Sequence, residues 1–344
     1  MEDPRDGVDD EGSPRAAKRR PRARPVPAEG EDGLFTQSWY PLCMASEVEV
    51  GKVLGLPFLD SRVVVFRGAD GEVQVMSAYC PHLGADLAAG CVVENRIRCA
   101  FHHWEYDRAG VCVKTGTGDP PVAGAALFRF PCAERYGLIW AFNGEAPLFD
   151  LPALPHAEDE LALKVGVYGE VFAVDPWVIC ANTPDFQHLR AVHGVVFDDL
   201  DPSASVEWTD HSMRYDLRGT LPGGEVLEYD LGIVGTTIFR QSGRLNGRWF
   251  GYFAALGLPS PGKTKVYMVV AVRRSEGDEA STQALLAGLY AFQTSLVDQD
   301  APILRGVRFT PGLMTKSDRA LARFFEYVRQ FPRANPAAGF LPGG

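Results

Sequence analysis

The stretch YCPHLGADLAAGCVVENRIRCAFHHWEYD, residues 79–107, holds three of the seven cysteines and three of the seven histidines of this 344-residue chain. Two short motifs stand out, because Cys80 is followed closely by His82, and Cys99 by His102. A zinc finger pairs its cysteines first and its histidines second, and it spaces the histidines more widely. The order found here indicates a metal centre that takes one thiolate and one imidazole from each of two loops.

Two cysteines on one iron and two histidines on the other form the ligand set of a Rieske [2Fe–2S] cluster. The stretch resembles the Rieske loops of the ring-hydroxylating oxygenase family, including Trp104 and Tyr106 after the second loop. Residues 39–41 (Trp-Tyr-Pro) likewise resemble the usual start of that domain. We therefore predict a cluster held by Cys80, His82, Cys99 and His102. Cys91 and His103 fall outside both pairs, and Cys91 is expected to be a small core residue.

Respiratory-chain Rieske proteins resemble this site but carry an additional cysteine in each loop, and those two form a disulfide. Ala85 and Phe101 stand at these positions here, and Trp104 stands where those proteins have a serine that bonds to a cluster sulfur. Fewer hydrogen bonds to the sulfurs stabilise the reduced cluster less. The resemblance therefore implies a low potential, which suits a relay of electrons toward oxygen activation.

A second motif lies in NTPDFQHLRAVHG, residues 182–194, which contains Asp185, His188 and His193. Two histidines and a carboxylate with open positions form the facial triad of non-haem Fe(II) oxygenases. On an ideal helix His188 and His193 are about 140° apart. We therefore expect His193 to lie where the helix distorts or ends, at Gly194. Downstream of a Rieske motif, this string resembles the catalytic helix of the oxygenase family.

The third ligand is expected to be a distant carboxylate in SLVDQDAPILRG, residues 295–306. Gln299-Asp300 fits the pattern of the family, although Arg305 stands where Glu is common. We predict that His188, His193 and Asp300 hold a mononuclear non-haem Fe(II), with Asp298 as the alternative carboxylate.

The resemblance also implies roles for two residues that are not ligands. Asp185 is expected to bridge His188 to the cluster histidine of a neighbouring subunit, the counterpart of His102, because the family forms head-to-tail trimers. A carboxylate between two ligand histidines orients both rings and raises their basicity. The alternative is that Asp185 is a helix cap. Asn182 matches a residue near the iron in the family, and we count it with Asp185 as a catalytic candidate.

Composition limits the broad class of the protein. Hydrophobic residues make up 46% and charged residues 23%, with a net charge of −10. The acidic balance argues against a nucleic-acid partner, and the lack of a long apolar run argues against a membrane span. An export signal requires an apolar segment after its basic residues, and no such segment follows the basic run at 18–24. We therefore expect a cytoplasmic protein, where clustered Cys and His bind metal more often than they form disulfides.

The order of predicted elements gives an α+β fold. Residues 1–34 read as a disordered charged tail. Residues 35–150 alternate short β-like runs with turns, for example around 68–71, and read as an all-β Rieske domain. Residues 151–344 read as a catalytic domain with an antiparallel sheet covered by helices, in the helix-grip manner. We expect a strand pair over 163–175 and helices over 176–194, 281–305 and 317–330.

The resemblance covers residues 39–312 and implies the terminal oxygenase of a Rieske non-haem iron system. We expect it to use O₂ and electrons from a separate NAD(P)H-dependent reductase, with or without a ferredoxin. The reaction expected is hydroxylation or oxidative dealkylation of an aromatic or polycyclic substrate by a homotrimer. One alternative is a cis-dihydroxylating dioxygenase. A second, from another class, is a Rieske electron carrier without oxygenase activity, which would hold only the irons of its cluster.

Overall fold

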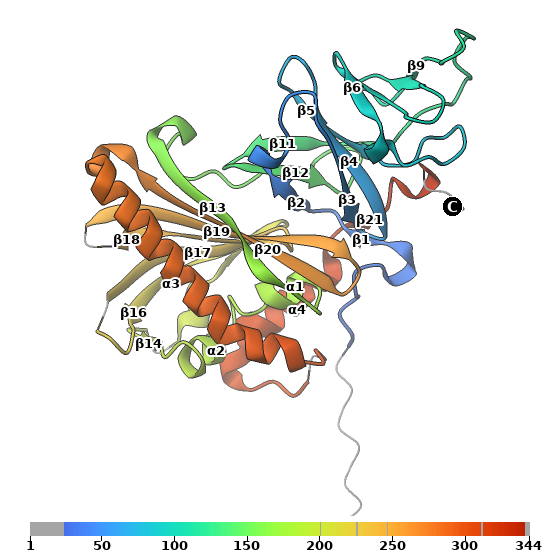
Figure 1. Cartoon of the computed structure of the whole chain (residues 1–344). Coiled ribbons are helices and arrows are strands. Elements are labelled where there is room, and N and C mark those ends of the chain that lie inside the picture. The colour runs from blue at the N-terminus through green and yellow to red at the C-terminus, as the bar shows by residue number, and fades with distance from the viewer. Residues whose placement is uncertain (1–23, 200, 225, 246, 311, 341–344) are drawn as a thin grey trace, which may run out of the picture.

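The computed structural model describes residues 24–199, 201–224, 226–245, 247–310 and 312–340. A part built only from short strands lies beside a larger sheet that is crossed by helices (Figure 1). This arrangement confirms the predicted α+β class. No helix among the described residues is long and apolar enough to span a membrane.

The smaller β part contains three antiparallel sheets. The expected hairpin around residues 68–71 is present, with Gly71 at a φ of +86° in the turn. The sheet orders are β10-β5-β4-β3, β11-β12-β2 and β6-β7-β8-β9. The strands are β2 (Trp39–Met44), β3 (Val53–Phe58), β4 (Ser61–Arg67), β5 (Val73–Ser77), β6 (Cys91–Val93), β7 (Arg96–Arg98), β8 (Glu105–Tyr106), β9 (Cys112–Lys114), β10 (Arg129–Phe130), β11 (Cys132–Arg135) and β12 (Leu138–Phe142).

The larger sheet is antiparallel and follows the order β13-β20-β19-β18-β17-β16-β14, with β15 paired to β16. Its first strand runs unbroken over residues 161–172, so the predicted strand pair is wrong. The strands are β13 (Leu161–Phe172), β14 (Val196–Phe197), β15 (Glu207–Trp208), β16 (Ser212–Thr220), β17 (Val226–Val234), β18 (Ile238–Leu245), β19 (Arg248–Ser260) and β20 (Lys263–Arg273).

Strand β20 shows how the sheet separates two cores. Its residues alternate between the two faces, because successive side chains of a strand point in opposite directions. Met268 and Val270 belong to the core beneath the helices, which also contains Phe324. Val269 belongs to the core shared with Trp140 of the smaller β part. The sheet is therefore buried on both sides, which accounts for the nearly continuous apolar sequence of this strand.

Two longer helices cover the sheet face away from the β part. Helix α3 (Glu279–Gly306) lies diagonally across β13 and β20, and α4 (Arg319–Gln330) packs into the same core (Figure 1). The helix predicted over 176–194 is instead two short helices, α1 (Pro176–Cys180) and α2 (Phe186–Ala191). Pro184 disfavours helical backbone at the residue before it. Asp185 then caps α2 as a new start.

The described end of the predicted tail is packed against the fold. Glu29 is buried, and its carboxylate accepts hydrogen bonds from the backbone N–H and the hydroxyl of Thr36. Strand β1 (Phe35–Thr36) pairs with β21 (Arg333–Ala334) from the far end of the chain. The expectation of a disordered tail is therefore wrong for residues 24–34, and residues 1–23 lie outside the described part.

Short 3-10 helices complete the elements: η1 (Glu31–Gly33), η2 (Ala45–Glu47), η3 (Leu87–Ala89), η4 (Glu158–Glu160), η5 (Pro202–Ser205), η6 (Arg274–Glu276), η7 (Lys316–Asp318) and η8 (Ala338–Phe340).

Candidate metal centres

The two Cys/His loops share one backbone pattern. In the first, the N–H of Cys80 donates to the carbonyl of Ala85 at 2.9 Å, and the N–H of Gly84 donates to the carbonyl of Cys80 at 2.8 Å. In the second, the N–H of Cys99 donates to the carbonyl of Trp104 at 2.9 Å, and the N–H of His103 donates to the carbonyl of Cys99 at 3.1 Å. The fourth residue after each cysteine, Gly84 or His103, has a left-handed backbone. Two local turns therefore present their cysteines in equivalent ways.

The side chains of these loops separate by type. The sulfurs of Cys80 and Cys99 are buried, at 2% and 1% exposure. The rings of His82 and His102 lie nearer the surface, edge to face, with centroids 4.5 Å apart. The Trp104 indole stacks on His82 at 4.4 Å and fixes the plane of that ring. A pair of thiols beneath a pair of imidazoles fits a [2Fe–2S] cluster with mixed ligation.

A hydrogen bond to the sulfur of Cys80 was not predicted from the sequence. The Tyr106 hydroxyl lies 3.0 Å from Cys80 Sγ, and it is the donor when the sulfur is a thiolate. Burial raises the pKa of the Cys80 thiol, and this hydrogen bond acts in the opposite direction. Loss of the serine hydroxyl at Trp104 is therefore partly offset by a hydroxyl two residues later.

Cys91 lies in β6 between the two loops and is exposed. The prediction that it fills a core position is wrong, because β6 runs along the surface here and turns this side chain outward.

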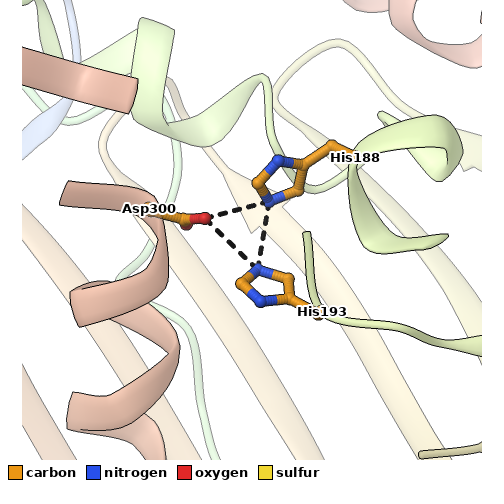
Figure 2. A group of neighbouring side chains, drawn as sticks. All are labelled: His188, His193 and Asp300. Carbon is orange, nitrogen blue, oxygen red and sulfur yellow. Dashed lines mark hydrogen bonds and ion pairs between the residues drawn. The ribbon is translucent and has the colours of Figure 1, made fainter. Parts of the chain in front are cut away.

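A second group of side chains converges in the larger part of the molecule. The Nε2 atoms of His188 and His193 are 3.1 Å apart, and Asp300 Oδ1 lies 3.3 Å from the first and 3.4 Å from the second (Figure 2). Asp300 Oδ1 is buried and has no hydrogen-bond donor among the described residues. Two nitrogens bound to one metal ion at right angles, at about 2.1 Å each, also lie about 3 Å apart. The three atoms therefore fit one face of a metal ion.

The two histidines reach this point because α2 ends between them. His188 lies inside the helix, whereas His193 follows its C-cap at Val192. Gly194 has a φ of +70°, and the next N–H, of Val195, bonds back to the carbonyl of Leu189 at 3.0 Å. The expected distortion at Gly194 is present, and it turns His193 toward His188.

Helix α3 brings Asp300, and not Asp298, to the histidines. Asp298 points away, and its carboxylate accepts a hydrogen bond of 2.6 Å from the Tyr168 hydroxyl. Asp300 Oδ2 accepts a hydrogen bond of 3.2 Å from Asn182 Nδ2, which leaves Oδ1 for the site. Arg305, where the family often has Glu, pairs with Glu170 at the surface.

Gln299 makes a contact with His193 that was not predicted from the sequence. Its Oε1 lies 2.9 Å from Nδ1 of His193, so it accepts the proton of that nitrogen and leaves Nε2 free to bind metal. Burial lowers the pKa of His188, with Asp300 acting in the opposite direction. Burial raises the pKa of Asp300, and both histidines oppose that shift. Neutral imidazole is the form that binds metal.

A family model of the Rieske [2Fe-2S] domain matches residues 38–128, which include both Cys/His loops. Cholesterol 7-desaturase nvd of Bombyx mori is 28% identical over 323 residues, which are 86% of this chain and 69% of that protein. The oxygenase component of dicamba O-demethylase from Stenotrophomonas maltophilia is 33% identical over 161 residues, 45% of this chain and 47% of the relative. That alignment spans about half of each chain.

A solved structure of NdmA from Pseudomonas putida CBB5 superposes with a TM-score of 0.68 at 20% identity, over 85% of this chain and 89% of the other. At this identity the likeness shows a shared fold. The chain therefore contains a segment that matches the Rieske [2Fe-2S] domain, and it is similar to Rieske oxygenases along most of its length. The segment matched by the family model is the one that holds the two loops.

Two residues that were predicted to act without binding metal lie beside the His/His/Asp group. Asn182 orients the carboxylate of Asp300, as described above. Asp185 Oδ1 accepts a hydrogen bond of 2.9 Å from the backbone N–H of His188, which is the geometry of a helix cap. Among the described residues, no hydrogen bond joins Asp185 to the ring of His188 or to His102. The bridge to a neighbouring subunit therefore stays a prediction.

A cavity opens beside His188, His193 and Asp300, between α3 and the sheet. Its empty volume, counted out to its open mouth, is about 920 Å³. Leucine, valine, phenylalanine and tyrosine side chains form most of its wall. Small-molecule sites are commonly apolar cavities with a few polar groups. The cavity therefore offers room for a small organic molecule directly beside the three converging side chains.

Proposed function

We propose that this chain is the terminal oxygenase component of a Rieske system that hydroxylates or oxidatively dealkylates an organic substrate. Two electrons from a separate reductase, with or without a ferredoxin, are used with one O₂. One oxygen atom enters the product and the other leaves as water. The observation that carries the proposal is the group of Asp300 Oδ1 and two imidazole nitrogens, which opens onto an apolar cavity.

In this proposal the Rieske cluster is held by Cys80, His82, Cys99 and His102. His188, His193 and Asp300 hold a mononuclear iron. When bound, that iron supplies the open coordination positions at which O₂ is activated.

The surrounding residues position these ligands. Gln299 keeps the proton of His193 on Nδ1, and Asn182 holds Asp300 so that one oxygen faces the histidines. The apolar wall of the cavity excludes water from the reacting carbon and places it beside the site.

The arrangement also supports transfer of electrons between subunits. Strands β6 and β9, which flank the Cys/His loops, lie at the far end of the molecule from α2 (Figure 1). His82 is exposed and His102 is partly exposed, so the rings of the Cys/His loops are accessible to a second copy of the chain. The homotrimer that we propose, in the cytoplasm, has Asp185 bridging His188 to the cluster histidine of a neighbouring subunit, the counterpart of His102.

The division of labour along the chain remains part of the proposal. Residues 35–150 carry the cluster, and residues 151–344 carry the mononuclear iron. The return of β21 to pair with β1 means that the end of the second segment completes a sheet with the start of the first.

Mono-oxygenation is supported over cis-dihydroxylation by relatives whose names are demethylases. A pure electron carrier is not favoured, because such a protein has no use for three converging ligands beside a cavity.

Iron content and labelled oxygen test the proposal together. Wild-type protein should contain the two irons of the cluster and one more, and should transfer label from ¹⁸O₂ into product when reduced with a substrate panel. Asp300→Ala should keep the cluster but lose the third iron, and it should form no product. Asp298→Ala, a matched change on the same helix, should keep the third iron and form product. Two irons in the wild type would assign it to the electron carriers. Incorporation of both atoms of O₂ would assign it to the dioxygenases.

A further inference from the structure

Two buried amides face each other in the wall of the cavity. Gln293 of α3 donates from Nε2 to Oε1 of Gln241 of β18 at 3.0 Å. Both side chains are buried, with 3% and 4% exposure, and both line the cavity. Each primary amide has two donor hydrogens and one acceptor oxygen. The bond between them therefore leaves the NH₂ of Gln241 and the C=O of Gln293 without a partner among the described residues.

This property does not depend on which way the amides are turned. Reversing both exchanges their roles and still leaves one NH₂ group and one C=O group for a ligand. A buried polar group that lacks a hydrogen bond is destabilising, so the pair favours a ligand that satisfies it.

The position of the pair sets it apart from the metal ligands. Gln293 and Asp300 are at positions i and i+7 on α3, which places them on one face and about 10 Å apart along the helix axis. Gln241 is the cross-strand partner of Tyr252, and both line the cavity. The amides therefore lie two helical turns from the carboxylate that faces the histidines, at another part of the same cavity.

The charges of the wall limit the ligand further. Among the described residues that line the cavity there is no Lys or Arg, and the acidic side chain is Asp300. Tyr215 is occupied by a hydrogen bond to the carbonyl of Thr183. At the amide end of the cavity, two helical turns from the proposed iron, an anionic group would lie without a neighbouring cation, which is costly in an apolar wall.

We infer that the substrate is a neutral, mainly apolar molecule with an uncharged hydrogen-bonding group, such as a ketone, ether or hydroxyl. That group binds Gln241 and Gln293, and an apolar carbon then lies beside His188, His193 and Asp300. The inference rests on the proposed function for its reaction, but the binding it describes does not need turnover.

Binding to the iron-loaded, oxidised protein tests the inference, with tetralin, 1-tetralone and 6-carboxy-1-tetralone as probes in equilibrium dialysis. With the ketone on the amides, the carboxylate of the third probe should make binding at least about tenfold weaker, because no Lys or Arg of the cavity wall offsets its charge. The Kd of tetralin divided by that of 1-tetralone measures the contribution of the amides, since the two probes differ at one carbon.

The double variant Gln241→Leu/Gln293→Leu removes both amides and leaves neither unpaired. In it, this ratio should fall by about 2- to 10-fold relative to the wild type, the equivalent of one neutral hydrogen bond. Gln241→Glu keeps an acceptor for Gln293 but removes the NH₂, and should weaken 1-tetralone by a similar factor. Gln283→Leu, an exposed change on the same helix, should leave the ratio unchanged. Cluster absorption and iron content show that each variant is folded.

Three outcomes would overturn the inference: an unchanged ratio in both folded amide variants, a carboxylate that binds as tightly as the ketone, or no binding by any probe. Failure of the proposed function has a different signature. In that case the binding ratios follow the amides as expected, but no label from ¹⁸O₂ enters any product. If product forms and the ratio ignores the amides, the oxygenase proposal stands and the substrate assignment is wrong.

Discussion

The two predicted metal-ligand groups of this protein are built in opposite ways. The predicted cluster ligands come from residues 80–102, in two local turns whose backbone hydrogen bonds are repeated almost bond for bond. The other group joins the end of a six-residue helix to a residue of a 28-residue helix more than a hundred positions later. A site made of local turns depends mainly on its own sequence, whereas a site made of distant elements depends on the packing that brings them together.

The two groups also differ in what surrounds them. The cluster loops hold sulfur in a small core and leave a histidine exposed, which suits electrons that arrive from another protein. The His/His/Asp group faces a cavity, which suits a reaction with a small molecule. Substitutions in one group should therefore abolish metal binding there without loss of the metal at the other.

The largest effect is expected from Cys99→Ala. All four ligands are needed to hold two irons, so the visible absorption and the EPR signal of the reduced cluster should disappear. The third iron should remain, because no residue of the loops contributes to its ligands. Cys91→Ala, at an exposed cysteine of the same segment, is the matched control and should keep the spectrum. A Cys99→Ala protein that is folded and retains the cluster spectrum would remove the ligand assignment.

Asp185→Asn tests the proposed link between the two groups. Asn caps a helix about as well as Asp, so α2 and both metal centres should remain. Asn lacks the charge and cannot accept from two imidazole N–H groups in the same way, so product formation should fall by at least about 10- to 100-fold.

Single-turnover experiments on pre-reduced Asp185→Asn protein separate the step that fails. Reduction of the cluster by an external donor should stay fast while product appears slowly. Wild-type rates would mean that Asp185 is only a helix cap, and the main support for a head-to-tail trimer would be lost.

Gln299→Leu should act on the His/His/Asp group alone. Without an acceptor at Nδ1, the tautomer and ring orientation of His193 are no longer fixed, and iron affinity should fall by about tenfold. Gln299→Glu keeps an acceptor oxygen and should retain the iron. Titration with a chelator, followed by iron analysis, measures the difference. Equal affinities in the Leu and Glu variants would show that the hydrogen bond seen at 2.9 Å does not support the ligand.

The smallest effect is expected from Tyr106→Phe. The hydroxyl donates to Cys80 Sγ, and a donor to sulfur stabilises the reduced cluster more than the oxidised one. Its loss should lower the potential by on the order of 40 mV, the one-electron equivalent of about 1 kcal/mol. Redox titration followed by EPR measures the shift, and Tyr79→Phe serves as the control. A potential that does not move would mean that the hydroxyl makes no bond to the loaded cluster.

Prediction of the fold from sequence succeeded where the signal was local. Alternating apolar residues around an Asp-Gly turn specified the hairpin of β4 and β5, and the helices predicted over 281–305 and 317–330 agree with α3 and α4 within a few residues. It failed where a local pattern was broken by one residue or overridden by packing. Pro184 divided the helix predicted over 176–194, and burial of Glu29 ordered a charged segment that reads as a tail.

The sequence by itself determined which residue types belong to the two metal centres and the spacing of the two Cys/His loops, because neighbouring residues are necessarily close. It left open whether Asp298 or Asp300 joins the histidines, since both lie on one helix and only the helix orientation separates them. It gave no sign of the contact between Gln299 and His193 or of the pairing of Gln241 with Gln293, because those contacts join positions far apart in the chain. Tertiary packing decided them by placing one face of α3 against α2 and the sheet.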